Sequence, residues 1–222
     1  SDDLQGTITN TLTNFNNNSL KTFNSAFRHS QVTKLIDDSD TSLTSNITRV
    51  VLGKFFTPTL NESVGYTISF NNVIFNPHAG HNTNEGGVIA STGFKVSGDT
   101  VNEMFLDEDG FGNIRRFYIL AGEKKYVDNT AGTVNYGNGI LSLNPLTINQ
   151  VSDVDNTSST QIRITTIPDS VDIIPVRNQL LEIDLVNTAV NVAIDRLGVG
   201  DINTVNTADL ATSSFTKTVS GY

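Results

Sequence analysis

The first 27 residues carry apolar side chains at helical spacing. Seven of them, separated by steps of three to five, form the N-terminal stripe: Leu4, Ile8, Leu12, Phe15, Leu20, Phe23 and Phe27. Such steps place side chains on one face of a helix. The intervening Thr and Asn residues are poor helix formers, and the phase breaks across residues 16–19, so we predict one long helix with a weak middle or two helices in series. An isolated helix of this composition is unstable, and the stripe must therefore pack against something.

A second, shorter helix is predicted immediately afterwards. Ser30 is a suitable N-cap, and Val32, Leu35 and Ile36 share one face of the turns that follow. The acidic residues 37–40 then end the helix.

From Leu43 the apolar period changes to two, which is typical of β-strands. Strand-like segments, separated by short Gly- and Asn-rich turns, are predicted within residues 45–60, 63–75, 88–98, 101–127, 132–136, 139–143, 160–168 and 177–186. This spacing indicates a sandwich or a barrel-like domain. The predicted fold class is therefore α+β, with N-terminal helices followed by a mainly antiparallel β domain. We expect a helical segment at 1–42, a β-rich assembly domain at 43–195 and a partly ordered tail at 196–222.

Composition narrows the classes of function. The net charge is −9, from 14 Lys and Arg against 23 Asp and Glu, so the chain lacks the basic face that nucleic-acid binding needs. It contains no cysteine, which excludes disulfides and thiolate chemistry. No apolar run approaches the roughly 20 residues that span a bilayer. We expect neither nucleic acid nor a membrane as a partner, and the missing initiator Met leads us to expect a piece of a longer protein.

The stretch "DEDGFGN", residues 107–113, is the best candidate for a metal or phosphate loop. Aligning Gly110 with the invariant glycine of an EF-hand places Phe105 at the first ligand and Arg116 at the bidentate glutamate, so the calcium pattern fails. Three acids would also repel a phosphate. We predict a hairpin between residues 104–107 and 114–120, with glycines at positive φ and acids that keep the tip in solvent.

Other candidate sites are weaker. His78 and His81 are suitably spaced to share a metal, but Glu85 or His29 would have to complete the site. The carboxylate pairs Asp153 with Asp155 and Glu182 with Asp184 could share a strand face, yet no apolar pocket is predicted to separate their pKa values. We therefore predict no enzyme activity, no metal and no cofactor.

Several segments together resemble a known family. The stretch "FNSAFRHSQVTKLIDDSDTSLTSN", the pair "DEDGFGNIRRFYI" and "AGTVNYGNGILSL", and "PVRNQLLEIDL" are similar, in this order, to the baseplate J and wedge family of contractile-tailed bacteriophages. The resemblance covers residues 4–195 and is strongest to the C-terminal part of the wedge proteins that close the inner baseplate ring. It leaves the tail after Leu197 without a match.

This resemblance implies a structural protein of the virion tail baseplate, assembled in the host cytoplasm. It also implies a homodimer between adjacent wedges and contacts with other wedge proteins. The N-terminal stripe would then pack on partners or on a second copy, with Leu12, Phe15, Leu20, Phe23 and Phe27 as interface residues, or form ordinary core. The β domain would supply the dimer contact through an exposed strand edge or a sheet face. A carbohydrate-binding or adhesive β module is the alternative, although Trp is absent.

Overall fold

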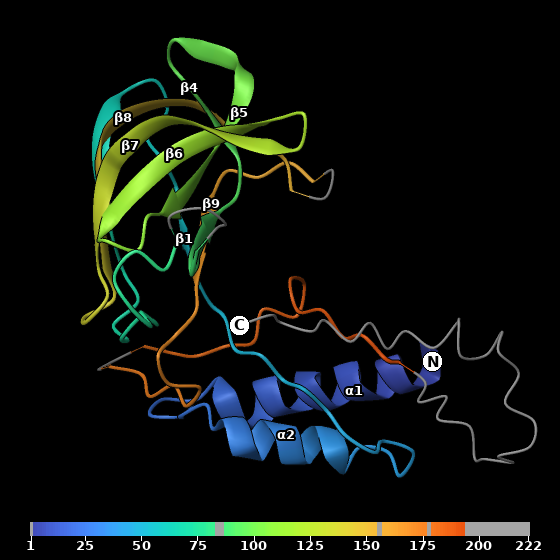
Figure 1. Ribbon diagram of the computed structural model, residues 1–222. Helices are drawn as coiled ribbons and strands as arrows, with labels where there is room; N and C mark the ends of the chain where they lie inside the picture. Colours follow the sequence, from blue (N-terminus) through green and yellow to red (C-terminus); the bar gives the residue numbers. More distant parts are fainter. Residues whose placement is uncertain (1, 83–86, 155–156, 177–178, 194–222) are drawn as a thin grey trace, which may run out of the picture.

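The structure is a computed structural model and describes residues 2–82, 87–154, 157–176 and 179–193. Figure 1 shows a β domain above a layer of two helices, with an extended segment leading from the helices to strand β1. We refer to the two helices and the chain packed on them as the helical layer.

Both predicted helical regions are present. The first consists of α1 (Asp2–Phe15) and a π-helical turn, η1 (Asn16–Leu20), and the second is α2 (His29–Asp37). Four threonines of α1 donate hydrogen bonds to the carbonyl four residues earlier, which gives these poor helix formers a partner within the helix: Thr7, Thr9, Thr11 and Thr13. The wider turn of η1 lies where the phase of the stripe breaks.

The predicted cap of α2 is wrong. The helix begins at His29 rather than after Ser30, and the His29 N–H donates to Asp172 Oδ1 at 2.9 Å. A carboxylate from a distant part of the chain thus takes the role that the sequence assigned to a local serine.

The larger sheet closes into a five-stranded barrel. Its strands are β4 (Phe94–Val96), β5 (Asp99–Glu108), β6 (Asn113–Leu120), β7 (Glu123–Asn135) and β8 (Ile140–Val151). They pair antiparallel in this order, and β8 then pairs with both β7 and β4 to complete the ring. Strand β2 (Ser63–Ser69) adds to β8.

A three-stranded sheet packs beside the barrel. Strand β9 (Ile162–Thr166) lies between β1 (Leu52–Phe56) and β3 (Ile89–Ser91). Ile162 and Ile164 are fully buried in the same core as the barrel residues, so the two sheets share one apolar interior. The predicted class, helices followed by a mainly antiparallel and barrel-like β domain, is confirmed.

The strand predicted over 177–186 is wrong for its described part, residues 179–186, which pair with no strand. Leu181, Ile183 and Leu185 alternate at period two because the chain is extended, but they pack on the helices. The predicted tail at 196–222 lies outside the described residues.

Candidate assembly interface

The helical layer has an apolar core of its own. Its buried members come from α1, η1 and α2: Ile8, Leu12, Phe15, Leu20, Val32 and Ile36. Partly buried side chains between residues 181 and 192 pack against them, and Figure 1 shows this returning segment running alongside α1. The core of the helical layer is thus formed by residues near both ends of the described sequence.

The five predicted interface residues fall into three groups. Leu12, Phe15 and Leu20 are buried in the core of the helical layer. Phe27 is partly buried against it and forms a backbone bridge with Ile173. Phe23 is 72% exposed. Of the five, only Phe23 presents most of its ring to solvent.

A buried polar contact fixes the returning segment on η1. Asn16 is almost fully buried, and its Oδ1 accepts a hydrogen bond from the Ile183 N–H at 2.8 Å. Lys21 and Glu182 add an exposed ion pair nearby at 3.0 Å. The buried hydrogen bond specifies the register of the segment, since an unpaired buried amide would be costly.

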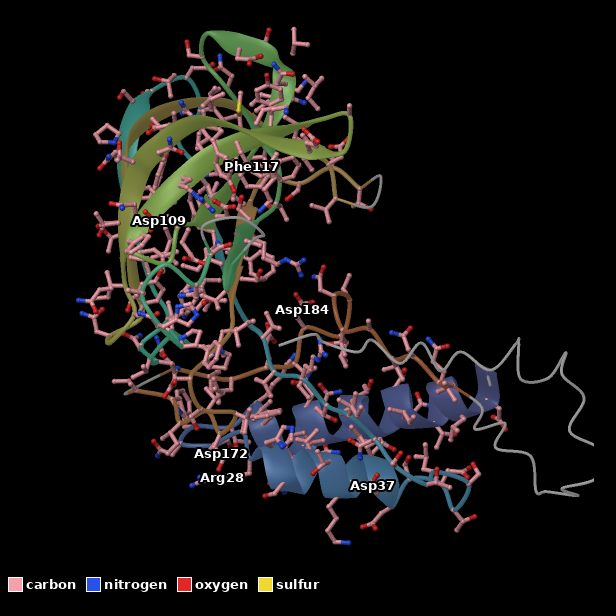
Figure 2. All side chains as sticks on the ribbon, in the orientation of Figure 1. Arg28, Asp37, Asp109, Phe117, Asp172 and Asp184 are labelled. Atoms are coloured by element: carbon pink, nitrogen blue, oxygen red, sulfur yellow. The ribbon has the colours of Figure 1, made fainter. Side chains whose placement is uncertain are left out.

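A second contact joins the chain that leaves β9 to the start of α2. Asp172 accepts hydrogen bonds from the His29 N–H and, at 3.0 Å, from Arg28 Nη1. Figure 2 shows Arg28 and Asp172 side by side at this end of the helices. The N–H of His29, followed by the Arg28 guanidinium, holds the pKa of Asp172 below its ordinary value.

The segment between the helical layer and the small sheet has a strictly alternating surface. From residue 46 to 57 every even-numbered residue is partly buried and every odd-numbered one is exposed. Two even-numbered residues of this segment are hydrogen-bonded to α2. His29 Nε2 donates to the Thr48 carbonyl at 3.0 Å, and Asn46 Nδ2 donates to the Thr33 carbonyl at 3.1 Å. We call residues 46–57 the ribbon.

The exposed face of the ribbon, formed by its odd-numbered residues, is apolar at three positions. Ile47 is 91% exposed, Val51 57% and Phe55 52%. They recur every four residues, so an extended chain presents all three on one side. Such a row, next to a strand that ends a sheet, is a surface that other chains can occupy.

The hairpin predicted around "DEDGFGN" is confirmed, with β5 and β6 as its arms. Gly110 and Gly112 have φ values of 77° and 104°, as predicted for the glycines of the turn. Asp109 Oδ1 accepts from the N–H groups of Phe111 at 2.8 Å and Asn113 at 3.0 Å. Burial alone would raise the pKa of Asp109, but these hydrogen bonds and one from the Asn113 side chain hold it below its ordinary value.

The prediction that the acids keep this tip in solvent is wrong for two of the three. Asp107 is almost fully buried and lies opposite Arg115 on the neighbouring strand. Its Oδ1 accepts from Arg115 Nε at 2.9 Å, and its Oδ2 accepts from Lys124 Nζ at 2.7 Å and the Tyr126 hydroxyl at 2.8 Å. Two cations and a hydroxyl thus compensate this carboxylate for its loss of water.

Glu108 points to the other face of the strand and is completely buried. Its oxygens accept hydrogen bonds from Asn82 Nδ2 at 2.9 Å, the Val88 N–H at 3.0 Å, the Gly110 N–H and the Tyr136 hydroxyl at 2.8 Å. Burial, followed by the bond to Glu108, raises the pKa of Tyr136 well above its ordinary value. These donors stabilise a carboxylate inside the barrel end, a role that is structural.

His81, one of the two histidines suggested to share a metal, lies next to the buried Glu108. His81 Nδ1 lies 3.0 Å from the His78 carbonyl and 3.1 Å from Asn76 Oδ1, both acceptors, so this nitrogen carries a proton. Its Nε2 lies 3.4 Å from Glu108 Oε1. His29, one suggested third ligand, is instead bonded to Thr48, and Glu85 lies outside the described residues.

The suggested carboxylate pairs do not form a described site. Glu182 pairs with Lys21, and Asp184 lies 3.7 Å from Arg163, while Asp155 is outside the described residues. Across the described ranges, no group of three or more His, Asp or Glu side chains is arranged to hold a metal ion. None of the described helices is long and apolar enough to cross a membrane.

The N-terminal quarter of the chain is similar to a known family. Residues 1–54 match the family model described as baseplate structural protein gp6, C-terminal domain III. The predicted resemblance to a phage baseplate wedge protein is confirmed. The match spans α1, η1, α2 and most of the ribbon, and it supports a structural role in a phage baseplate. No curated protein matches the sequence.

Sequence reasoning missed the buried charges and the ribbon. The pairing of Asp107 with Arg115 could have been found, because the predicted hairpin places the two residues nearly opposite each other. The outward face of Ile47, Val51 and Phe55 could not be told from the sequence, because the even-numbered face of the same segment carries as many apolar residues. Apart from Gly110, the donors to Glu108 carried no local signal, since Asn82, Val88 and Tyr136 lie far from it in the sequence.

Proposed function

We propose that this chain is an assembly module of a phage tail baseplate, forming the homodimer contact between neighbouring wedges that helps to close the inner ring. The observation that carries the proposal is the position of the family match. It covers both helices and runs into β1 as far as residue 54, and so includes Ile47 and Val51 of the exposed apolar face.

Within this proposal the chain has no enzymatic role. It binds other baseplate wedge proteins in addition to a second copy, and its place is the virion tail baseplate after assembly in the host cytoplasm. The division into a helical segment at 1–42, an assembly domain at 43–195 and a tail stays a prediction, to which the structure adds that residues 181–192 pack on the helices.

Phe23 is the residue of the N-terminal stripe best placed to meet a partner. Its ring is exposed, whereas Leu12, Phe15 and Leu20 are occupied within the chain. We therefore assign the stripe mainly to the core of the helical layer and propose Phe23 as its outward contact with other wedge proteins.

The test is the molar mass of the 222-residue chain, measured by light scattering after size exclusion over a concentration series. We expect the mass to approach twice 24.0 kDa as the concentration rises into the micromolar range. A mass that stays at 24.0 kDa at high micromolar concentration would overturn the homodimer.

Carbohydrate binding is the less supported alternative. Sugar sites commonly use exposed aromatic rings with free polar tips. Here the hydroxyls of Tyr126 and Tyr136 are bonded to Asp107 and Glu108. A glycan screen that found specific binding by a monomeric chain would reverse our preference.

A further inference from the structure

The ribbon has one backbone edge that the small sheet does not use. Arg163 of β9 directs its carbonyl to the Thr92 N–H and its N–H to Thr92 Oγ1, and Ile167 directs its N–H to the Val88 carbonyl. The backbone N–H and C=O groups of odd-numbered β9 residues therefore point toward β3, and those of even-numbered residues point toward β1. Each even-numbered residue of β9 lies opposite an even-numbered residue of β1. It follows that Gly53 and Phe55 of β1 point their N–H and C=O groups away from β9.

Within the part of the chain that the structure describes, this outer edge has no strand beside it. Strand β1 ends the sheet, and no backbone–backbone hydrogen bond reaches residues 46–51. The ribbon thus combines an unused row of donors and acceptors with exposed apolar side chains. These two features are what strand addition by another chain requires.

The sequence of the ribbon is complementary to itself. In an antiparallel pair centred on Val51, each Ile47 lies opposite Phe55 of the second copy, and Val51 lies opposite its own equivalent. This register brings all three exposed apolar residues into cross-strand pairs, the contacts that stabilise sheets. It also uses the odd-numbered residues, the ones whose backbone groups face outward in β1.

The charges of the ribbon fit the same register. Residues 46–57 contain no acid, although the whole chain has a net charge of −9, so the contact brings no carboxylates together. Arg49 lies opposite Gly53 of the second copy rather than opposite another cation. Like charges directly across a strand pair would be destabilising.

Gly53 supports the approach of another chain. Its φ is not in the left-handed region, and a Cβ added there would meet no atom within 4 Å. The chain's own packing therefore does not require glycine at this position. A glycine inside a strand often marks the close approach of another backbone, and here it leaves room for the Arg49 side chain.

We infer that two copies of this chain pair through their ribbons, antiparallel and centred on Val51, to form a continuous six-stranded sheet across a twofold axis. The strand order of that sheet is β3-β9-β1 followed by β1-β9-β3 of the second copy. This inference rests on the proposed homodimer and names the surface that forms it.

The absence of cysteine permits a direct test with single-cysteine variants. Directly opposed Cα atoms of a hydrogen-bonded antiparallel pair are ~5.5 Å apart, within the range that a disulfide spans. Under mild oxidation Val51→Cys should convert most of the chain to a dimer that reduction reverses. Val101→Cys, at an 85% exposed position on β5, should give only a background level.

A charge at the same position gives an independent measurement. Val51→Lys places two ammonium groups across the axis and should shift the dimer toward the monomer by at least tenfold in dissociation constant, while Val101→Lys should not. If the unmodified chain is dimeric but Val51→Cys cross-links no faster than Val101→Cys, the ribbon is the wrong surface and the homodimer stands. If the unmodified chain is monomeric, the homodimer itself is wrong.

Discussion

The end of the barrel and the helical layer are held together by different means. The barrel end contains two buried carboxylates on opposite faces of β5, Asp107 bonded to two cations and a hydroxyl and Glu108 to several hydrogen-bond donors. The helical layer relies on an apolar core built on helices of low intrinsic stability, with Asp172 and residues 181–192 added from far along the chain. The first arrangement penalises loss of any one partner, whereas the second depends on long-range contacts to keep short helices formed.

The largest effect should follow from removing the centre of the charged cluster. Asp107→Ala leaves the buried Arg115 guanidinium without its carboxylate partner, bonded only to backbone carbonyls, and also removes a partner of Lys124. Breaking such a buried pair should lower the free energy of unfolding by about 4 kcal/mol, measured by urea denaturation. Glu62→Ala, at an exposed acid, is the control and should change it by less than ~0.5 kcal/mol. Equal effects for the two variants would show that the cluster is not structural.

A cavity in the helical layer should be somewhat less costly and should stay local. Leu20→Ala removes a buried side chain from the core of the helical layer. It should lower the free energy of unfolding by about 3 kcal/mol. Hydrogen exchange should accelerate in α1 and α2 and remain unchanged in β5 and β6. Phe23→Ala, at the exposed member of the stripe, should leave both regions unchanged in the monomer. Uniform acceleration across the barrel would contradict two separately stabilised regions.

The barrel end should also weaken at alkaline pH. Burial, followed by the hydrogen bond to Asp107, raises the pKa of Tyr126 to about 12 from an ordinary 10.0. Above pH 10 the unfolded chain loses this proton first, so the stability contributed by Tyr126 is complete below pH 10 and is lost as the pH rises toward 12. Tyr126→Phe should flatten the decline in unfolding free energy between these values. An unchanged slope would show that Tyr126 does not titrate with unfolding.

The smallest effect is expected at Asp172, the partly buried cap of α2. The pKa of Asp172 lies below its ordinary 3.8 because the His29 N–H and Arg28 stabilise the carboxylate. Its contribution is therefore complete well above pH 3.8 and is lost as the pH falls below that value. Asp172→Ala should reduce helicity at neutral pH slightly and remove part of the acid-induced loss, measured by circular dichroism. Asp169→Ala, at a nearby exposed acid, should do neither.

Local patterns predicted much of this fold because they record local geometry. The stripe predicted the helices, the period of two predicted most of the strands, and the glycines predicted the hairpin after Glu108. The failures concern partners distant in sequence. The cap at Asp172 comes from 143 residues beyond His29.

The surface that we propose as the interface differs from the residues predicted for it, and both stay predictions. A strand edge of the β domain was expected to supply the contact, but the residues chosen were those of the stripe, which the chain largely buries by itself. Helical periodicity shows that a face is apolar without showing what covers it, and here residues 181–192 do so.

Amide hydrogen exchange of the ribbon over a dilution series tests the central claim most directly, because it reports both association and its location. Pairing through the ribbon predicts that the amides of Ile47, Arg49, Val51, Gly53 and Phe55 gain protection as the protein concentration rises, while those of β6 remain unchanged. Protection in the ribbon that does not depend on concentration, with the chain dimeric by mass, would contradict it.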